Sequence, residues 1–137
     1  MSAAIKVAYS LLTASSDVIN IVGFRIYPNV AEPGQTTPMI VMSTIDAPPT
    51  PTQDGDSAID SYRLQLDLFA QDIYAYGSGI SMLTSLAAAV RTALARHTGV
   101  IAGYTVNGIQ SAGQQDDYDT ELKLHRKILD FIIRIKP

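Results

Sequence analysis

The sequence predicts an α+β fold: a mixed, mainly antiparallel sheet of about five strands, with one long and one short helix packed on one face. Three observations lead to this class. Apolar residues recur at helical spacing in two segments, apolar and polar residues alternate in others, and strand-like segments occur on both sides of the longer helical segment. The expected order of elements is α-β-β-β-α-β-β, within a single domain of residues 1–137.

The chain is expected to begin with a short helix. Residues 3–14 carry apolar side chains every three or four positions, which is typical of an amphipathic helix. Ser16 or Asp17 can cap a following turn, because short polar side chains accept hydrogen bonds from free N–H groups at a helix start. Gly23 can end that turn in a left-handed conformation.

The next segments predict three strands and one long loop. Residues 24–27 form a short strand that stops at a proline, and a Pro-Gly turn within residues 31–37 leads to a second strand at residues 39–45. Residues 47–60 contain three prolines and lack apolar periodicity, so they are expected to form a loop. Strict alternation at residues 62–68 predicts a half-buried third strand.

A long helix is expected after this strand, with Asp72 as its N-cap and Gly99 at its C-terminal end. Gly77 and Gly79 weaken its first turns. The apolar stripe that predicts the helix consists of Ile73, Tyr76, Ile80, Leu83, Ala87, Val90 and Leu94.

Two strands and a second loop complete the chain. Residues 104–109 predict a fourth strand, and the polar residues 111–120 predict a loop. The last strand covers about residues 122–135, and its apolar alternation changes phase, which predicts a bulge near Arg126. The loops at 47–60 and 111–120 each join two strands, so each is expected at the tip of a long hairpin.

Composition excludes several classes of function. The net charge is −3 and the ten basic residues are scattered, which argues against direct nucleic-acid binding because phosphate contacts need clustered Lys and Arg. The chain has no cysteine, so disulfides and thiolate metal sites are excluded, and this fits a protein made and used in the cytoplasm. No apolar run approaches the length of a membrane span.

The sequence offers little for catalysis. His97 at a helix end and His125 among charged residues are expected on the surface, and no Gly-x-Ser-x-Gly motif is present. Gly77-Ser78-Gly79 lacks the third glycine of a dinucleotide-binding turn. We therefore expect no enzyme activity, no cofactor and no metal, and a small-ligand enzyme is the least favoured class.

Acidic residues in the two expected loops form the one suggestive cluster. They do not match the spacing of a calcium-binding loop, so they are either solvated carboxylates or a negative band that repels passing DNA. Tyr118 lies among them and is either an interface anchor or a cover for the sheet. The candidate acidic residues are Asp54, Asp56, Asp116, Asp117 and Asp119.

The arrangement of segments resembles the tail-completion, or tail-to-head joining, proteins of long-tailed bacteriophages. The resemblance spans nearly the whole chain in order, and each motif alone is weak because it is mostly core pattern. The matching segments are RIYP at 25–28, PMIV at 38–41, the strand at 64–70, VRTAL at 90–94 and RKILDFII at 126–133.

This resemblance implies a structural virion protein that caps the head-proximal end of the tail tube as a ring and helps join the tail to the head. It implies a homo-oligomer, expected to be a hexamer, with the tail-tube protein and a head-completion or connector protein as partners. DNA would pass without specific binding, and no membrane is involved. Arg25, Tyr27 and Pro28 then form either a packed structural corner or part of the subunit contact. The alternative is another phage adaptor, such as a baseplate or head-completion component.

Overall fold

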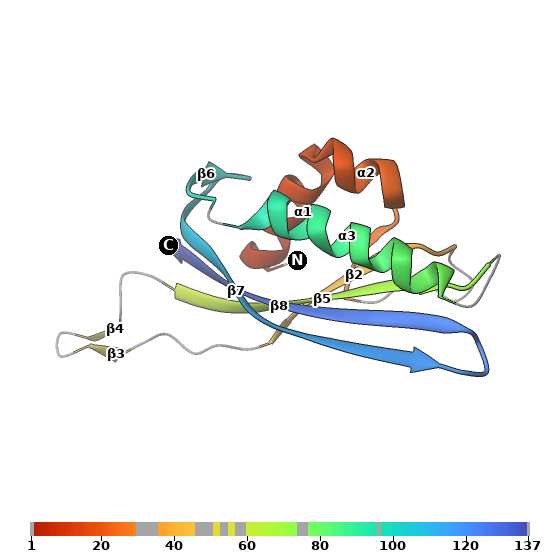
Figure 1. Ribbon diagram of the computed structural model, residues 1–137. Coiled ribbons are helices and arrows are strands. Elements are labelled where there is room, and N and C mark those ends of the chain that lie inside the picture. Colours follow the sequence, from red (N-terminus) through yellow and green to blue (C-terminus); the bar gives the residue numbers. More distant parts are fainter. Residues whose placement is uncertain are drawn as a thin grey trace.

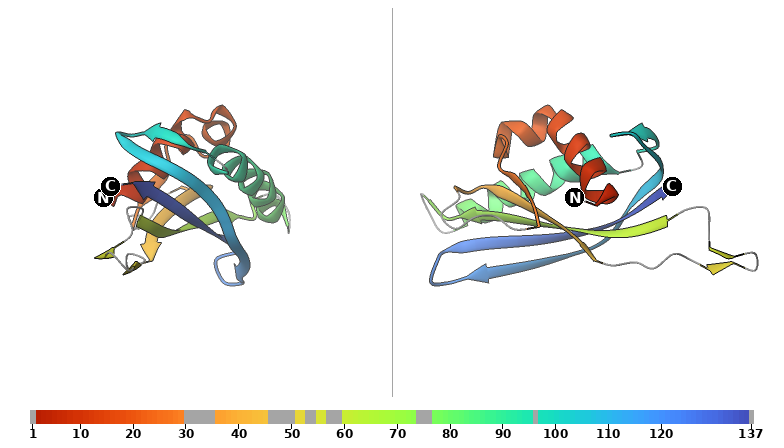
Figure 2. Two further views of the ribbon diagram at one scale, coloured as in Figure 1. Left: turned by 90° about the vertical axis from the view of Figure 1, so that its left-hand side faces the viewer. Right: turned by 180° about the vertical axis from the view of Figure 1, so that it is seen from behind.

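A curled six-stranded sheet with three helices on one face forms the body of the protein (Figures 1 and 2). The computed structural model describes residues 2–29, 36–45, 51–52, 55–56, 60–73, 77–95 and 97–136. The elements are α1 (Ala3–Ala14), α2 (Ser16–Val22), β1 (Ile26–Pro28), β2 (Met39–Ile45), β3 (Pro51–Thr52), β4 (Gly55–Asp56), β5 (Asp60–Gln71), α3 (Ser78–Leu94), β6 (Gly99–Ile101), β7 (Tyr104–Asp119) and β8 (Leu124–Lys136).

The strand order in the main sheet is β1-β2-β5-β8-β7-β6. Only the β1–β2 pair is parallel, and all the other neighbours are antiparallel, so the expected mixed, mainly antiparallel sheet is confirmed. The sheet has six strands rather than about five, because the short β6 pairs with the start of β7. A separate two-stranded sheet, β3–β4, lies within the expected loop of residues 47–60.

The core lies between the helices and the inner face of the sheet. Alternate residues of β5 and β8 point inward, and their twelve register pairs follow one another without a break from Asp60↔Ile135 to Gln71↔Leu124. Helices α1 and α3 bury apolar side chains against this face, which removes them from water. The largest fully buried side chains are Phe131, Ile5, Leu12, Ile40, Met42, Leu64, Leu66, Leu68, Leu83, Leu86, Leu94 and Leu129.

The N-terminal helices form as expected, with two differences. Helix α1 has the expected bounds, and Ser2 caps it by accepting a hydrogen bond from the N–H of Ile5. The expected turn after it is a second helix, α2, whose N-cap is Ser15 rather than Ser16 or Asp17. Gly23 ends α2 with a φ of 59°, which an L side chain rarely adopts. The expected Pro-Gly turn at residues 33–34 lies outside the described residues.

The long helix begins later than the sequence predicts. Helix α3 starts at Ser78, so Ile73 precedes it and is 62% exposed, and Ile80 is 49% exposed. Leu86 takes a place in the buried stripe instead. The C-cap is Ala95, and Gly99 begins β6 rather than ending the helix.

The C-terminal half differs most from expectation. Residues 111–119 are not a loop but the second half of β7, and the turn between β7 and β8 covers only residues 120–123. The expected bulge near Arg126 is wrong: β8 keeps one alternation throughout, while β7 carries two register shifts, at Val106/Gly108 and Ser111/Gly113. The inward alternation of β8 therefore extends as far as His125, which is buried.

Among the described residues, no single helix is long and apolar enough to cross a membrane. Helices α1 and α2 meet the criteria of length and composition only as a pair, and they bend by 89° at the break between them.

Candidate functional site at the hairpin end of the sheet

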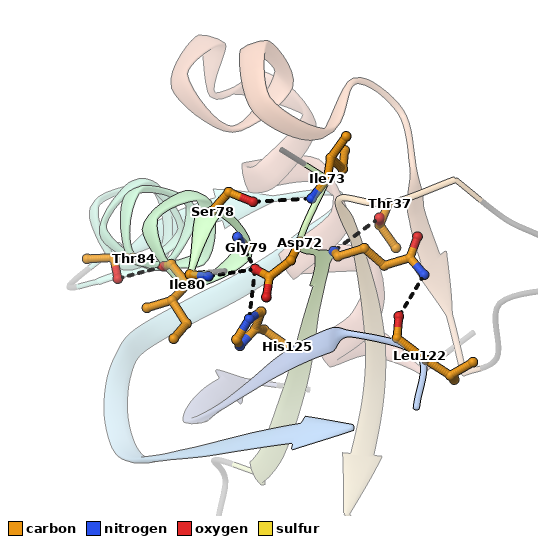
Figure 3. Close-up of polar contacts among 11 residues, drawn as sticks. Thr37, Asp72, Ile73, Ser78, Gly79, Ile80, Thr84, Leu122 and His125 are labelled. Carbon is orange, nitrogen blue, oxygen red and sulfur yellow. Dashed lines mark hydrogen bonds and ion pairs between the residues drawn. The ribbon is translucent and has the colours of Figure 1, made fainter. Parts of the chain in front are cut away.

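One end of the sheet brings together most of the polar side chains that the sequence singled out. We call it the hairpin end and define it as the end of β5, the first turn of α3 and residues 114–127 of β7 and β8. The N–H of Asp72 donates to the carbonyl of Lys123 at 3.0 Å, which joins the end of β5 to the β7–β8 turn. Figure 3 shows the polar contacts that hold this region together.

Asp72 caps helix α3 from outside the helix. The N-cap residue is Gly77, which has no side chain to accept hydrogen bonds. The Oδ1 atom of Asp72 instead accepts from the N–H of Gly79 at 2.8 Å (Figure 3). It also accepts from the N–H of Gly77 at 3.2 Å. The expected N-cap position is therefore wrong, because Asp72 lies several residues before the helix, but its carboxylate accepts a hydrogen bond from the first turn as a cap does.

His125 completes this contact from the sheet side. Its Nε2 lies 2.9 Å from Asp72 Oδ1, and the residue is only 4% exposed, so the expectation of a surface histidine is wrong. A Cβ added to Gly79 would lie 2.6 Å from the His125 ring and 2.9 Å from the carbonyl oxygen of Ala70. Glycine is therefore required at this position, because only its lack of a side chain lets the helix approach the sheet so closely.

The hydrogen bonds also determine the charge state of Asp72. Burial by itself would raise the pKa of this carboxyl group. The N–H of Gly79, the ring of His125 and the N–H of Gly77 act in the opposite direction, and together they hold the pKa of Asp72 below its ordinary value of 3.8. Asp72 is therefore ionised at neutral pH and acts as a fixed acceptor between helix and sheet.

A cavity of about 370 Å³ opens beside this contact, between the start of α3 and the β7–β8 hairpin. Tyr118 lies over His125, with ring centroids 4.3 Å apart, and is half-buried. This position fits the expectation that Tyr118 covers the sheet, and its use as an interface anchor stays a prediction. The cavity is lined by Ile80, Leu83, Asp116, Asp117, Tyr118, His125, Arg126 and Lys127.

The acidic residues of β7 have distinct surroundings. Asp116 Oδ1 lies 2.8 Å from Lys127 Nζ across the strand pair, where the Lys127 side chain is 12% exposed and that of Asp116 is 65% exposed. Asp119 Oδ1 accepts from the N–H groups of Glu121 and Leu122, which closes the β7–β8 turn. Asp119 therefore has a structural role, whereas Asp116 and Asp117 lie on an exposed part of β7.

The segments that carry the two acidic groups adjoin opposite ends of β5. Residues 47–60 follow β2 and lead into the start of β5, whereas the β7–β8 turn lies at the end of β5 (Figure 1). Eleven residue steps of β5 separate these two ends, about 37 Å at the usual rise per residue. Asp54 lies outside the described residues, as does the side chain of Asp56. A shared acidic lumen therefore stays a prediction.

The corner at Arg25 favours a structural reading. The Nε of Arg25 donates to the carbonyl of Pro38 at 2.8 Å, and the N–H of Ile40 donates to the carbonyl of Arg25 at 3.0 Å. Tyr27 and Pro28 pair in register with β2. These contacts join the start of β1 to β2, and a role of this corner in subunit contact stays a prediction.

Other candidate sites are weak. Within the part of the chain that the structure describes, no group of three or more His, Asp or Glu side chains is placed to hold a metal ion. His97 follows α3 and is half-buried. One feature of the sequence could have indicated that His125 is buried. It stands an even number of positions from the buried apolar residues of β8, so it points to the same side of the sheet as they do.

Comparison with solved structures finds the same fold in a phage-like particle. A chain from a structure titled "Virion of native gene transfer agent (GTA) particle" superposes with a TM-score of 0.78 at 17% sequence identity, covering 96% of this chain and 92% of that chain. At this identity the match establishes the fold. A comparison with curated protein sequences gave no significant match.

The chain therefore shares its fold with a chain of that particle. More particularly, the chain belongs to the family described as "Tail completion protein gp17", whose model matches residues 7–136. The protein is thus a structural, tail-related protein of a bacteriophage virion, located in the tail, where it associates with other virion proteins.

Proposed function

We propose that the protein closes the head-proximal end of the phage tail tube as a ring of identical subunits and joins the finished tail to the head. It acts by association and catalyses no reaction. The observation that carries this proposal is the family match over residues 7–136, which assigns the chain to tail completion. The expected hexamer derives from the resemblance of the sequence to tail-to-head joining proteins.

The shape of the subunit supports a ring between two different partners. The β2–β5 connection and the β7–β8 turn leave the sheet at opposite ends, so each subunit offers two different ends for contact. Head-to-tail contacts between identical subunits form a closed ring when their rotation closes. In this arrangement, one end of each subunit contacts the tail-tube protein and the other contacts a head-completion or connector protein.

The charges are compatible with a DNA conduit. The net charge is −3, and two of the arginines on the helix-free face are paired with carboxylates: Arg63 with Asp130 at 3.2 Å and Arg126 with Asp67 at 2.7 Å. Paired cations release fewer counterions from DNA phosphates than free ones, so they bind passing DNA weakly. DNA therefore moves past the ring without specific binding.

Electron microscopy of particles assembled with and without the protein tests this proposal. We expect particles without it to contain separate full heads and tails of irregular length. In complete virions, we expect the protein on the tail axis beside the head. Normal-length tails joined to heads in its absence would contradict the proposal, as would density for the protein at the distal baseplate.

A further inference from the structure

The second half of β7 is an uncovered sheet edge. Strand β6 pairs only with Tyr104–Val106, and among the described strands no other pairs with the outer side of β7. Residues 110–117 are all exposed. After the second register shift, residues 114–119 pair with β8 in unbroken register, so their outer side offers a regular row of backbone N–H and C=O groups. Such an edge can accept another strand.

The charge of this edge limits what can bind there. Strand β7 contains three aspartates and neither lysine nor arginine. Two β7 edges placed together would bring aspartates side by side, and like charges on neighbouring strands are destabilising. Among the described strands, the other open edges belong to β1, β6, β3 and β4, to the end of β2 and to both ends of β5 beyond its pairing with β2, and no residue at these edges is basic. A second copy therefore offers no strand of complementary charge.

The adjacent cavity adds a requirement for an apolar side chain. Asp116 and Tyr118 pair in register with Lys127 and His125, so they lie on the helix side of the sheet. A strand added beside them would direct one side chain to the mouth of the cavity. Ile80, one of the residues that line this cavity, is 49% exposed.

We propose that the free edge of β7 at residues 114–119 binds a β-strand of a different virion protein, with Lys or Arg beside Asp116 and Asp117 and an apolar residue beside Tyr118. This inference rests on the proposed function, because it takes the partner from the proteins next to the tail end. Added backbone hydrogen bonds supply affinity, and the two aspartates and the cavity select the strand. Asp116 and Asp117 thus recognise a protein partner.

A single engineered cysteine tests this, because the chain has none of its own. Gln115→Cys lies on the free edge, opposite Ile128, and Thr105→Cys is the matched control, exposed on the same face of β7 but beside β6. We expect assembly into virions to slow maleimide modification of Gln115→Cys by about tenfold or more and to change that of Thr105→Cys less than about twofold. Equal reaction rates for Gln115→Cys in free protein and virions would overturn the proposal.

Cross-linking identifies the partner. A benzophenone attached at Gln115→Cys before assembly, and irradiated in purified virions, should join the protein to a strand of a different virion protein that carries Lys or Arg. Adding Asp116→Lys and Asp117→Lys should lower the yield about tenfold, and more than Asp116→Asn with Asp117→Asn does, because lysine reverses the charge. Cross-links to another copy, or yields unaffected by the lysines, would contradict the proposal. If the cross-link forms but microscopy places the protein away from the head, the proposed function fails and this inference stands.

Discussion

The imidazole of His125 lies 2.9 Å from the carboxylate of Asp72, and both side chains are only 5% exposed. His125 belongs to β8, and Asp72 connects β5 to the start of α3, so the contact fixes the helix to the sheet at the hairpin end. The same carboxylate oxygen accepts from Gly77 and Gly79. One side chain therefore links three parts of the chain.

Gly79→Ala should destabilise the protein, although alanine is the better helix former by about 1 kcal/mol. The new Cβ would lie 2.6 Å from the His125 ring and 2.9 Å from the backbone oxygen of Ala70, which cannot move freely. We expect the free energy of unfolding to fall by roughly 1 to 3 kcal/mol, as for other overpacked sites. Urea denaturation measures this. Ser81→Ala, at an exposed helix position, is the control, and a Gly79→Ala variant more stable than the parent would contradict the close approach.

Asp72→Asn should make stability less dependent on pH in acid. The pKa of Asp72 is lowered in the folded state, so its contribution is present above its ordinary value of 3.8 and is lost as pH falls through the folded value. Thermal melts between pH 2 and neutrality should show the variant less stable at neutral pH and approaching the parent in acid. Asp17→Asn, an exposed carboxylate of α2, is the control. A difference in stability between variant and parent that stays constant across this pH range would show that the effect does not come from the charge of Asp72.

The buried face of α3 should dominate its contribution to stability. Leu83 and Leu94 are buried against the sheet, whereas Thr84 and Thr92 are exposed. We expect Leu83→Ala or Leu94→Ala to cost roughly 2 to 5 kcal/mol of unfolding free energy, because each leaves a cavity. Thr84→Ala and Thr92→Ala should each cost much less. Thermal denaturation of the four variants ranks them, and the reverse order would contradict the phase of the helix.

Shortening residues 48–58 should separate folding from assembly. The change leaves β2 and β5 paired and removes almost no apolar surface, and loop length alters closure entropy only slightly. We expect little change in melting temperature but failure to form complete tails, because contacts with a neighbour are lost. Plaque counts and electron microscopy measure assembly. Infectious particles at normal yield would show that this segment is dispensable.

Apolar alternation predicted the strands that pack on the core. Strand β2 has the predicted bounds, and the inward leucines of β5 are those that the pattern indicated, because burial on one face imposes alternation. The second half of β7 was mispredicted as a loop for the same reason: it is an edge strand in which residues 110–117 are all exposed, so neither of its faces selects apolar residues there. Its strand form comes from pairing with β8, which local sequence cannot indicate.

The candidate site was predicted only in part. Asp72 could be recognised as a helix cap because aspartate is a preferred residue just before a helix. Its contact with His125 depends on the register between β5 and β8, which the sequence does not indicate. The phase change inferred for the last strand came from treating Leu122 and Leu124 as core residues, whereas Leu122 is exposed and Leu124 is only partly buried. Leu122 lies in the β7–β8 turn, so a single inward–outward alternation describes β8. That alternation places His125 on the buried side.

The two connections that leave the sheet at opposite ends give the subunit a direction. A ring in which all copies face the same way, with β5 along its axis, has two unlike surfaces, one at the start of β5 and the other at the β7–β8 turns. A layer of this kind cannot continue a stack by adding further copies of itself unless its two surfaces fit each other. A one-way adaptor that ends one polymer and presents a new surface to the next component needs this asymmetry.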